Sequence, residues 1–227
     1  MHPVDLPRRA VSEAVGTGFL LATVVGSGIM GERLSSGNVA VALLANTLAT
    51  GAGLVALIAT FGSVSGAHFN PVVTLADAVQ SGTSWKDVPI YVAAQVSGAF
   101  AGVAAAHLMF GEPLFSASRH ARAGAAQLFS EFVATFGLLV VIGGVSRRRP
   151  AAVPVAVGAY ITAAYWFTSS TSFANPAVTL ARAATDTFAG IRPDDAPGFI
   201  AAQIAGATAA TALLRWLVPA APPLSDP

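Results

Sequence analysis

The sequence predicts an all-α membrane protein with six transmembrane helices and two re-entrant half-helices, arranged as an inverted repeat of three plus three helices. Three observations support this fold class. The composition is that of a membrane protein, the apolar segments number six, and an Asn-Pro phrase occurs twice, at residues 70–71 and 175–176.

The composition places the chain in a membrane. Of its 227 residues, 54% are hydrophobic and only 10% are charged, against about 25% charged in soluble proteins. At about 20 residues per crossing, the length allows about six crossings in one compact domain, 1–227, and no second domain. A net charge of +1 without a basic stripe argues against nucleic-acid binding. The absence of cysteine excludes disulfides and thiolate metal sites, and we expect neither cofactor nor metal.

Six apolar segments, each bounded by Gly, Pro or charged residues, are the expected membrane spans. The first residues, MHPVDLPRRA, lack the order of a cleavable signal, so the first apolar run is expected to be a membrane helix. The expected spans are residues 10–30, 38–60, 88–110, 125–145, 151–168 and 197–218.

The Asn-Pro phrases fall between the second and third spans and between the fifth and sixth. Each is followed by about ten residues compatible with a helix, which would reach about 15 Å, half of a hydrocarbon core about 30 Å thick. They predict two half-helices.

The chain reads as an internal duplication. VSEAVGTGFLLATVV resembles FSEFVATFGLLVVIG, and YVAAQVSGAFAG resembles FIAAQIAGATAA. The repeats cover about 10–110 and about 125–218. Each crosses the membrane an odd number of times, so the second must be inverted relative to the first.

Positive charge suggests the orientation. Arg8 and Arg9 precede the first span and the triple arginine 147–149 follows the fourth, which places both clusters, and both termini, in the cytoplasm. The bias rests mainly on the triple arginine, because the expected outer loops also carry arginines, namely Arg33, Arg119, Arg122 and Arg192.

The Asn-Pro residues suit helix starts. Asn70 and Asn175 are good N-caps, and Pro71 and Pro176 suit the first helical position. In an inverted repeat the two caps would meet near the midplane, where the helix dipoles, each worth about half a charge, disfavour cations.

The loops before the half-helices complete the expected pore. Irregular backbone at this depth is tolerated where it lines a wet cavity, so we expect the carbonyl groups of residues 65–69 and 171–174 to offer acceptors in single file. The pattern predicts a polar pore for uncharged, hydrogen-bonding solutes.

At this point a resemblance is plain. GAHFNPVVTLA and SFANPAVTLA resemble the paired loops of the aquaporin and aquaglyceroporin (major intrinsic protein) family, and the likeness covers about residues 10–218. It implies a channel that assembles as a homotetramer with one pore per subunit. The second phrase keeps the family's alanine as Ala177, whereas the first has Val72 in that place.

Three further residues match family positions. Glu13 and Glu131 match a buried glutamate in the first helix of each repeat, and we expect them to accept N–H groups from the loops before the half-helices, with proton relay as the alternative. His68 matches a histidine at the cytoplasmic mouth, where a structural role and a pore-lining role both remain open.

The outer filter departs from the family. Most members carry Arg directly after the second Asn-Pro-Ala, but this chain has Val178. Arg182 lies one helical turn further on and is not expected to take its place. The family's other filter positions, counted from the two asparagines, fall on Thr50, Ala163 and Ser172 in this sequence. Thr171 is the alternative to Ser172.

Such a ring would be wide and mildly polar, with cation exclusion left to the half-helix dipoles. In the alternative interpretation, an aromatic side chain of the fifth span, Tyr165, Trp166 or Phe167, enters the gap and narrows it.

The resulting hypothesis is a passive, bidirectional channel in a bacterial inner membrane for water, glycerol-like polyols, urea and arsenous or antimonous acid. A water-selective channel is the first alternative, and an inverted-repeat secondary transporter is the second. No enzyme is expected, since no Ser/His pair, His cluster or paired Asp motif occurs at useful spacing.

Overall fold

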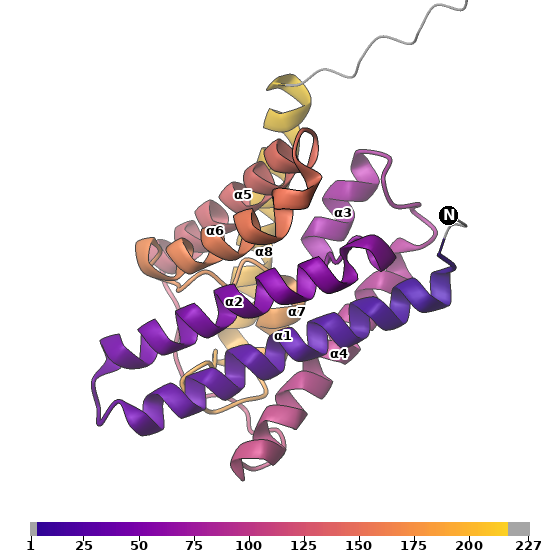
Figure 1. The fold of residues 1–227 in the computed structure, drawn as a ribbon. Helices are drawn as coiled ribbons and strands as arrows, with labels where there is room; N and C mark the ends of the chain where they lie inside the picture. Colours follow the sequence, from indigo (N-terminus) through magenta and orange to yellow (C-terminus); the bar gives the residue numbers. More distant parts are fainter. Residues whose placement is uncertain (1–3, 218–227) are drawn as a thin grey trace, which may run out of the picture.

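A computed structural model describes residues 4–217 and shows a helical membrane protein (Figure 1). The predicted position of the two termini concerns residues 1–3 and 218–227, which lie outside the described part. The helices are α1 Leu6–Leu34, α2 Val39–Ser65, α3 Pro71–Val79, α4 Val88–Phe110, α5 Ala125–Ser146, α6 Val153–Phe167, α7 Pro176–Arg182 and α8 Ala196–Leu217, with 3₁₀ turns η1 Pro150–Ala152 and η2 Pro193–Asp195.

The predicted fold class is confirmed. Within residues 4–217, six helical segments are long and apolar enough to cross a membrane, and α3 and α7 are short, with 9 and 7 residues. The first span extends beyond its predicted bounds at both ends, whereas the second starts at its predicted bound and runs five residues further, to the left-handed Gly66 that ends it. Asp5 accepts a hydrogen bond from the Arg8 N–H at the start of α1, and Asn38 accepts one from Val41 at the start of α2.

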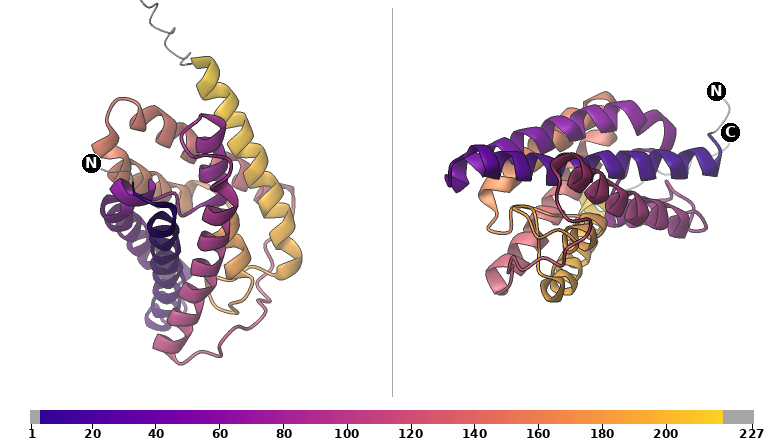
Figure 2. Two further views of the ribbon diagram at one scale, coloured as in Figure 1. Left: turned by 90° about the vertical axis from the view of Figure 1, so that its right-hand side faces the viewer. Right: turned by 90° about the horizontal axis from the view of Figure 1, so that it is seen from below.

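The two repeats have the same internal packing. In the first repeat α1 packs against α2 and α4, and in the second α5 packs against α6 and α8. Figure 2 shows α1 and α2, indigo to purple, running side by side in both views. Contact between α2 and α6 joins the repeats.

The half-helices interlock the repeats. Besides its contact with α4, α3 packs against α8 of the second repeat, while α7 packs against α8 and also against α4 and α1 of the first. Figure 1 shows α7 near the centre of the molecule, where it is seen between α1 and α2. Each half-helix therefore contacts both repeats. The facing surfaces of the two repeats enclose the space between α3 and α7.

Glycines let the long helices approach closely at equivalent places in the two repeats. A Cβ atom added to Gly98 in α4 would overlap the Ala14 carbonyl of α1, and one added to Gly206 in α8 would overlap the Phe132 carbonyl of α5. Both crossings are backbone-to-backbone contacts of the kind that small residues allow in membranes.

We expect Gly98→Val to destabilise the protein, because its side chain would be forced against the α1 backbone. Overpacking of this kind costs about 1–3 kcal/mol. Thermal unfolding in detergent should show a midpoint several degrees lower, whereas Gly144→Val, at an exposed α5 position with no atom within 4 Å of a built Cβ, should match the wild type. Equal midpoints for both variants would contradict this close crossing.

Candidate solute pathway between the half-helices

The two asparagines cap the half-helices. The Asn70 side-chain oxygen accepts a hydrogen bond from the Val72 N–H at 3.1 Å, and Asn175 accepts from Ala177 and Val178 at 3.0 and 3.3 Å. Pro71 and Pro176 occupy the first helical positions, where a missing N–H leaves no hydrogen bond unmade.

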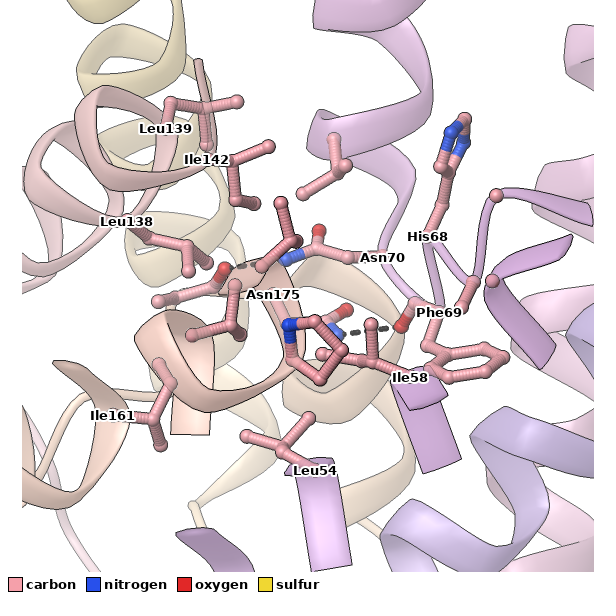
Figure 3. Close-up of a pocket in the computed structure, with 18 of the residues that line it drawn as sticks. Leu54, Ile58, His68, Phe69, Asn70, Leu138, Leu139, Ile142, Ile161 and Asn175 are labelled. Carbon is pink, nitrogen blue, oxygen red and sulfur yellow. Dashed lines mark hydrogen bonds between the residues drawn. The ribbon is translucent and has the colours of Figure 1, made fainter. Parts of the chain in front are cut away.

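The same two amides connect the repeats. The Asn70 Nδ2 donates to the Ala174 carbonyl and the Asn175 Nδ2 donates to the Phe69 carbonyl, both at 2.8 Å (Figure 3). Each amide keeps a second N–H, and both asparagines line the cavity described below. The amino ends of α3 and α7 therefore face each other across one narrow region.

The loops before the half-helices hold an unusual backbone. Ala67 and Phe69 have φ of 50° and 49°, and Thr171, Ser172 and Ala174 have φ of 60°, 51° and 48°. Non-glycine residues rarely adopt this left-handed region, and each such residue stores strain that its surroundings must offset.

These loops offer fewer acceptors than the sequence suggested. The Phe69 and Ala174 carbonyls accept from the opposite asparagines, and the Ser65 and Ser170 carbonyls accept from Tyr91 and Arg122. In the described part of the chain, the carbonyls of 66–68 and 171–173 accept no hydrogen bond outside regular helices. Of these residues, the ones that line the cavity are Gly66, Ala67, His68, Ser172 and Phe173.

Glu13 fixes the first loop. One carboxylate oxygen accepts from the Ser65 hydroxyl at 2.6 Å and the His68 N–H at 2.9 Å. The other accepts from the Phe69 N–H at 2.7 Å and from Gln95 at 2.8 Å. The side chain is fully buried, and four donors compensate its charge.

Glu131 repeats this arrangement in the second loop. Its oxygens accept from the Ser170 hydroxyl at 2.6 Å, the Phe173 and Ala174 N–H groups at 2.9 Å each, and Gln203 at 2.6 Å. The two glutamines thus belong to the carboxylate networks, although their sequence context suggested simple helix packing.

A cavity of about 790 Å³ runs past the asparagine pair. Figure 3 shows Leu138, Leu139 and Ile142 on one side of the asparagines and His68 and Phe69 on the other. Apolar side chains dominate its wall, including Leu54, Ile58, Leu138, Leu139, Ile142 and Ile161.

The predicted filter residues lie in different places. Thr50, Ser172 and Val178 are buried and line the cavity. Ala163 is exposed on the outer face of α6, and Tyr165 lines the cavity instead, with its hydroxyl donating to the Thr50 hydroxyl at 3.3 Å. Tyr165 lies two residues after Ala163, and two residues turn an α-helix by about 200°. The spacing argument therefore assigned the wrong face of α6 to the cavity.

A positively charged side chain also lines the cavity, at the end that contains Val178. Arg182 is 2% exposed, lines the cavity and donates from Nε to the Ala189 carbonyl. Its guanidinium carbon lies 3.4 Å from the centre of the Phe173 ring. Arg122 lies over the same ring at 5.0 Å and donates to the Gly190 carbonyl. Burial lowers the pKa of Arg122, in the α4–α5 loop, to about 10, so the group stays charged at neutral pH.

His68 lines the opposite end of the cavity. Its Nδ1 lies 3.1 Å from the Thr74 hydroxyl and its Nε2 lies 3.8 Å from the Asp77 carboxylate, which also lines the cavity. Arg147 reaches this end and donates to Gln80 at 3.1 Å. Sequence reasoning gave no role to Phe173, although it lies in the phrase SFANPAVTLA, and placed Arg122 only in an outer loop, because no local pattern indicates that two arginines contact the Phe173 ring.

Six spanning helices around two half-helices that meet cap to cap beside a lined cavity define a membrane channel. The chain belongs to the major intrinsic protein family, whose profile matches residues 1–168 and 146–223. It is 55% identical over 224 residues to aquaglyceroporin AqpS of Rhizobium meliloti (strain 1021), covering 99% of this chain and 96% of that protein.

Two more distant matches point in the same direction as this family assignment. Aquaporin NIP1-3 of Oryza sativa subsp. japonica is 32% identical over 187 residues, covering 79% of this chain and 64% of that protein. The crystal structure of an aquaglyceroporin from Plasmodium falciparum superposes with a TM-score of 0.71 at 21% identity, covering 93% of this chain and 95% of that one. This last match supports the fold.

We expect Glu131→Gln to destabilise the second loop, because the amide nitrogen cannot accept a hydrogen bond and leaves buried N–H donors unpaired. Each unpaired donor costs about 1–3 kcal/mol. The thermal midpoint in detergent and the solute flux should both fall, while Glu32→Gln, at an exposed position in the last turn of α1, should change neither. A carboxylate serving mainly as a proton relay would instead leave the midpoint unchanged.

Proposed function

We propose that the protein is a passive channel for small uncharged solutes, with glycerol-like polyols, urea and water as its substrates. The observation that carries this proposal is the cavity that passes the two capping asparagines and has an apolar wall beside free amide and carbonyl groups. Such a lining suits a solute with hydroxyl groups on one edge and carbon on the other.

The charge distribution along the cavity favours uncharged solutes over cations. The facing amino ends of α3 and α7 make the region around Asn70 and Asn175 electropositive. A cation would also have to leave its water shell in a cavity whose wall is mostly apolar. A neutral solute avoids both costs and can exchange hydrogen bonds along the loops.

We infer that the end of the cavity lined by Ser172, Val178 and Tyr165, here called the narrow end, sets the size limit. Val178 and Ser172 are small, and the Ser172 hydroxyl is buried without a hydrogen-bond partner among the described residues, so it is free to bind a solute. Arsenous and antimonous acids resemble polyols in size and donor pattern, and we include them as hypothetical substrates. The 55% identical relative carries the name aquaglyceroporin, in keeping with a pathway wider than water needs.

The cellular setting follows from the same family. We propose a homotetramer in a bacterial inner membrane, with both termini in the cytoplasm. Large apolar side chains exposed on the outer surface suit contact with lipid or with neighbouring subunits, among them Phe19, Leu44, Leu48, Phe129, Val155 and Trp166. The triple arginine after α5 supports the orientation.

One observation favours a water-selective channel. The Tyr165 hydroxyl reaches Thr50 from the facing helix at 3.3 Å, and this contact narrows the end of the cavity that contains Val178. A secondary transporter has less support, since Glu13 and Glu131 each already accept four hydrogen bonds and are not free to bind a coupling ion.

The decisive experiment is stopped-flow light scattering of proteoliposomes with water, glycerol, urea and arsenous acid gradients. We expect glycerol flux well above that of protein-free vesicles, and we expect Val178→Arg to lower it at least several-fold while water flux falls less, because the added side chain fills the narrow end. Fast water flux with glycerol flux at the protein-free level would support the water-selective alternative.

Tyr165 provides a second test of size selection. Tyr165→Ala should raise the ratio of glycerol to water flux by several-fold, since it removes the ring that reaches Thr50. Tyr165→Phe, which keeps the ring and loses only the hydroxyl, should change the ratio less. An unchanged ratio in the alanine variant would show that the narrowest point lies elsewhere.

A further inference from the structure

We propose that Arg182, held against the Phe173 ring, excludes cations from this channel, so that one residue, Val178, sets the width of the narrow end and another sets its charge. This inference rests on the proposed channel function. It replaces the expectation that the half-helix dipoles act alone.

The burial of Arg182 is the first argument. Only 2% of its surface is exposed, and the hydrogen bond found for its side chain runs from Nε to the Ala189 carbonyl. Among residues 4–217, no carboxylate forms an ion pair with it. A guanidinium group withdrawn from water without such a partner is costly, and charged groups kept inside membranes mark transport pathways.

Its orientation is the second argument. The guanidinium carbon lies over the Phe173 ring, 3.4 Å from its centre and well within the range of a cation–π contact. Phe173 is itself fixed, because its ring meets Phe199 edge-on at 5.2 Å and 80°. This contact holds the charge at the cavity wall that Arg182 lines.

The repeat symmetry shows why a residue one turn beyond Val178 can reach this place. Arg182 lies seven residues after Asn175, and Asp77 lies seven residues after Asn70. Each contacts the residue two positions before its asparagine, since Asp77 lies 3.8 Å from His68 as Arg182 lies over Phe173. Both charged residues line the cavity, but with opposite charge at opposite ends.

Neighbouring charges leave the Arg182 end positive. Arg122 adds a second buried guanidinium over the same ring. The buried carboxylates nearby are Glu131, whose charge is compensated by four donors, and Asp195, which pairs with Arg192 at 2.8 Å and accepts the Arg122 N–H. A cation entering the narrow end would therefore meet the Arg182 charge in the cavity wall, and Arg122, 5.0 Å from the same ring, adds to the positive potential. In a region of low dielectric constant, repulsion across several ångströms lowers the passage of a cation roughly tenfold or more.

The test compares ion leak with solute flux in the same proteoliposomes. Proton and Na⁺ uptake under an imposed membrane potential are measured beside glycerol flux for wild type, Arg182→Gln, Arg182→Lys and Arg119→Gln. We expect the ratio of cation leak to glycerol flux to rise at least tenfold in R182Q and to stay at the wild-type level in R182K, which keeps the charge. R119Q is the matched control, because Arg119 is a 90% exposed arginine paired with Asp186.

A wild-type ratio in R182Q would overturn the inference, as would a rise in R182K equal to that in R182Q. If R182Q is not recovered in folded form, Arg182→Met, an unbranched side chain without the charge, replaces it: a ratio at least tenfold above wild type supports exclusion by charge, and a wild-type ratio overturns it. Wild-type vesicles without glycerol flux would refute the proposed function separately. In that case the cation leak would be divided by the amount of channel protein instead of by the glycerol flux, and this value would be compared among the variants.

Discussion

The structure depends on two buried carboxylates that each collect four hydrogen bonds. Glu13 and Glu131 accept backbone N–H groups from loops whose residues lie repeatedly in the left-handed region. Without these acceptors, buried N–H donors would remain unpaired and nothing would offset the strain of five non-glycine residues with positive φ. The loop shape in turn leaves carbonyl groups free and brings each asparagine to the start of its half-helix, so the pathway is a consequence of the carboxylates.

The second constraint is the exchange of hydrogen bonds between repeats. Asn70 binds the loop of the second repeat and Asn175 binds that of the first, each at 2.8 Å. Because α3 also packs on α8 and α7 on α4, neither half-helix can move without disturbing both repeats. This reciprocity explains how nine-residue and seven-residue helices, too short to be stable alone, keep a fixed position at the centre of the molecule.

The sequence was sufficient where a residue acts through its own backbone neighbourhood. The spans, the capping asparagines and the prolines that follow them all depend on local hydrogen bonding and hydrophobicity, and the structure has them close to where they were predicted. It was insufficient where helix rotation or side-chain reach decides. Counting back from Asn175 selected Ala163, which is exposed, because a spacing does not reveal how α6 is rotated toward the cavity. Likewise, no local pattern indicates that the long Arg182 side chain contacts Phe173 and lines the cavity.

The comparison of the two ends shows how one symmetric framework yields an asymmetric pathway. The framework residues are equivalent in both repeats. Gln95 donates to Glu13 and Thr74 in the first repeat, and Gln203 donates to Glu131 and Thr179 in the second. The residues that differ lie at the ends of the half-helices and just before the asparagines: His68 with Asp77 in one repeat, and Phe173 with Arg182 in the other. None of these four side chains hydrogen-bonds directly to Glu13 or Glu131, and only His68 touches a network, through Thr74 at 3.1 Å. The duplicated core can therefore conserve the fold while the two mouths acquire different charge and width.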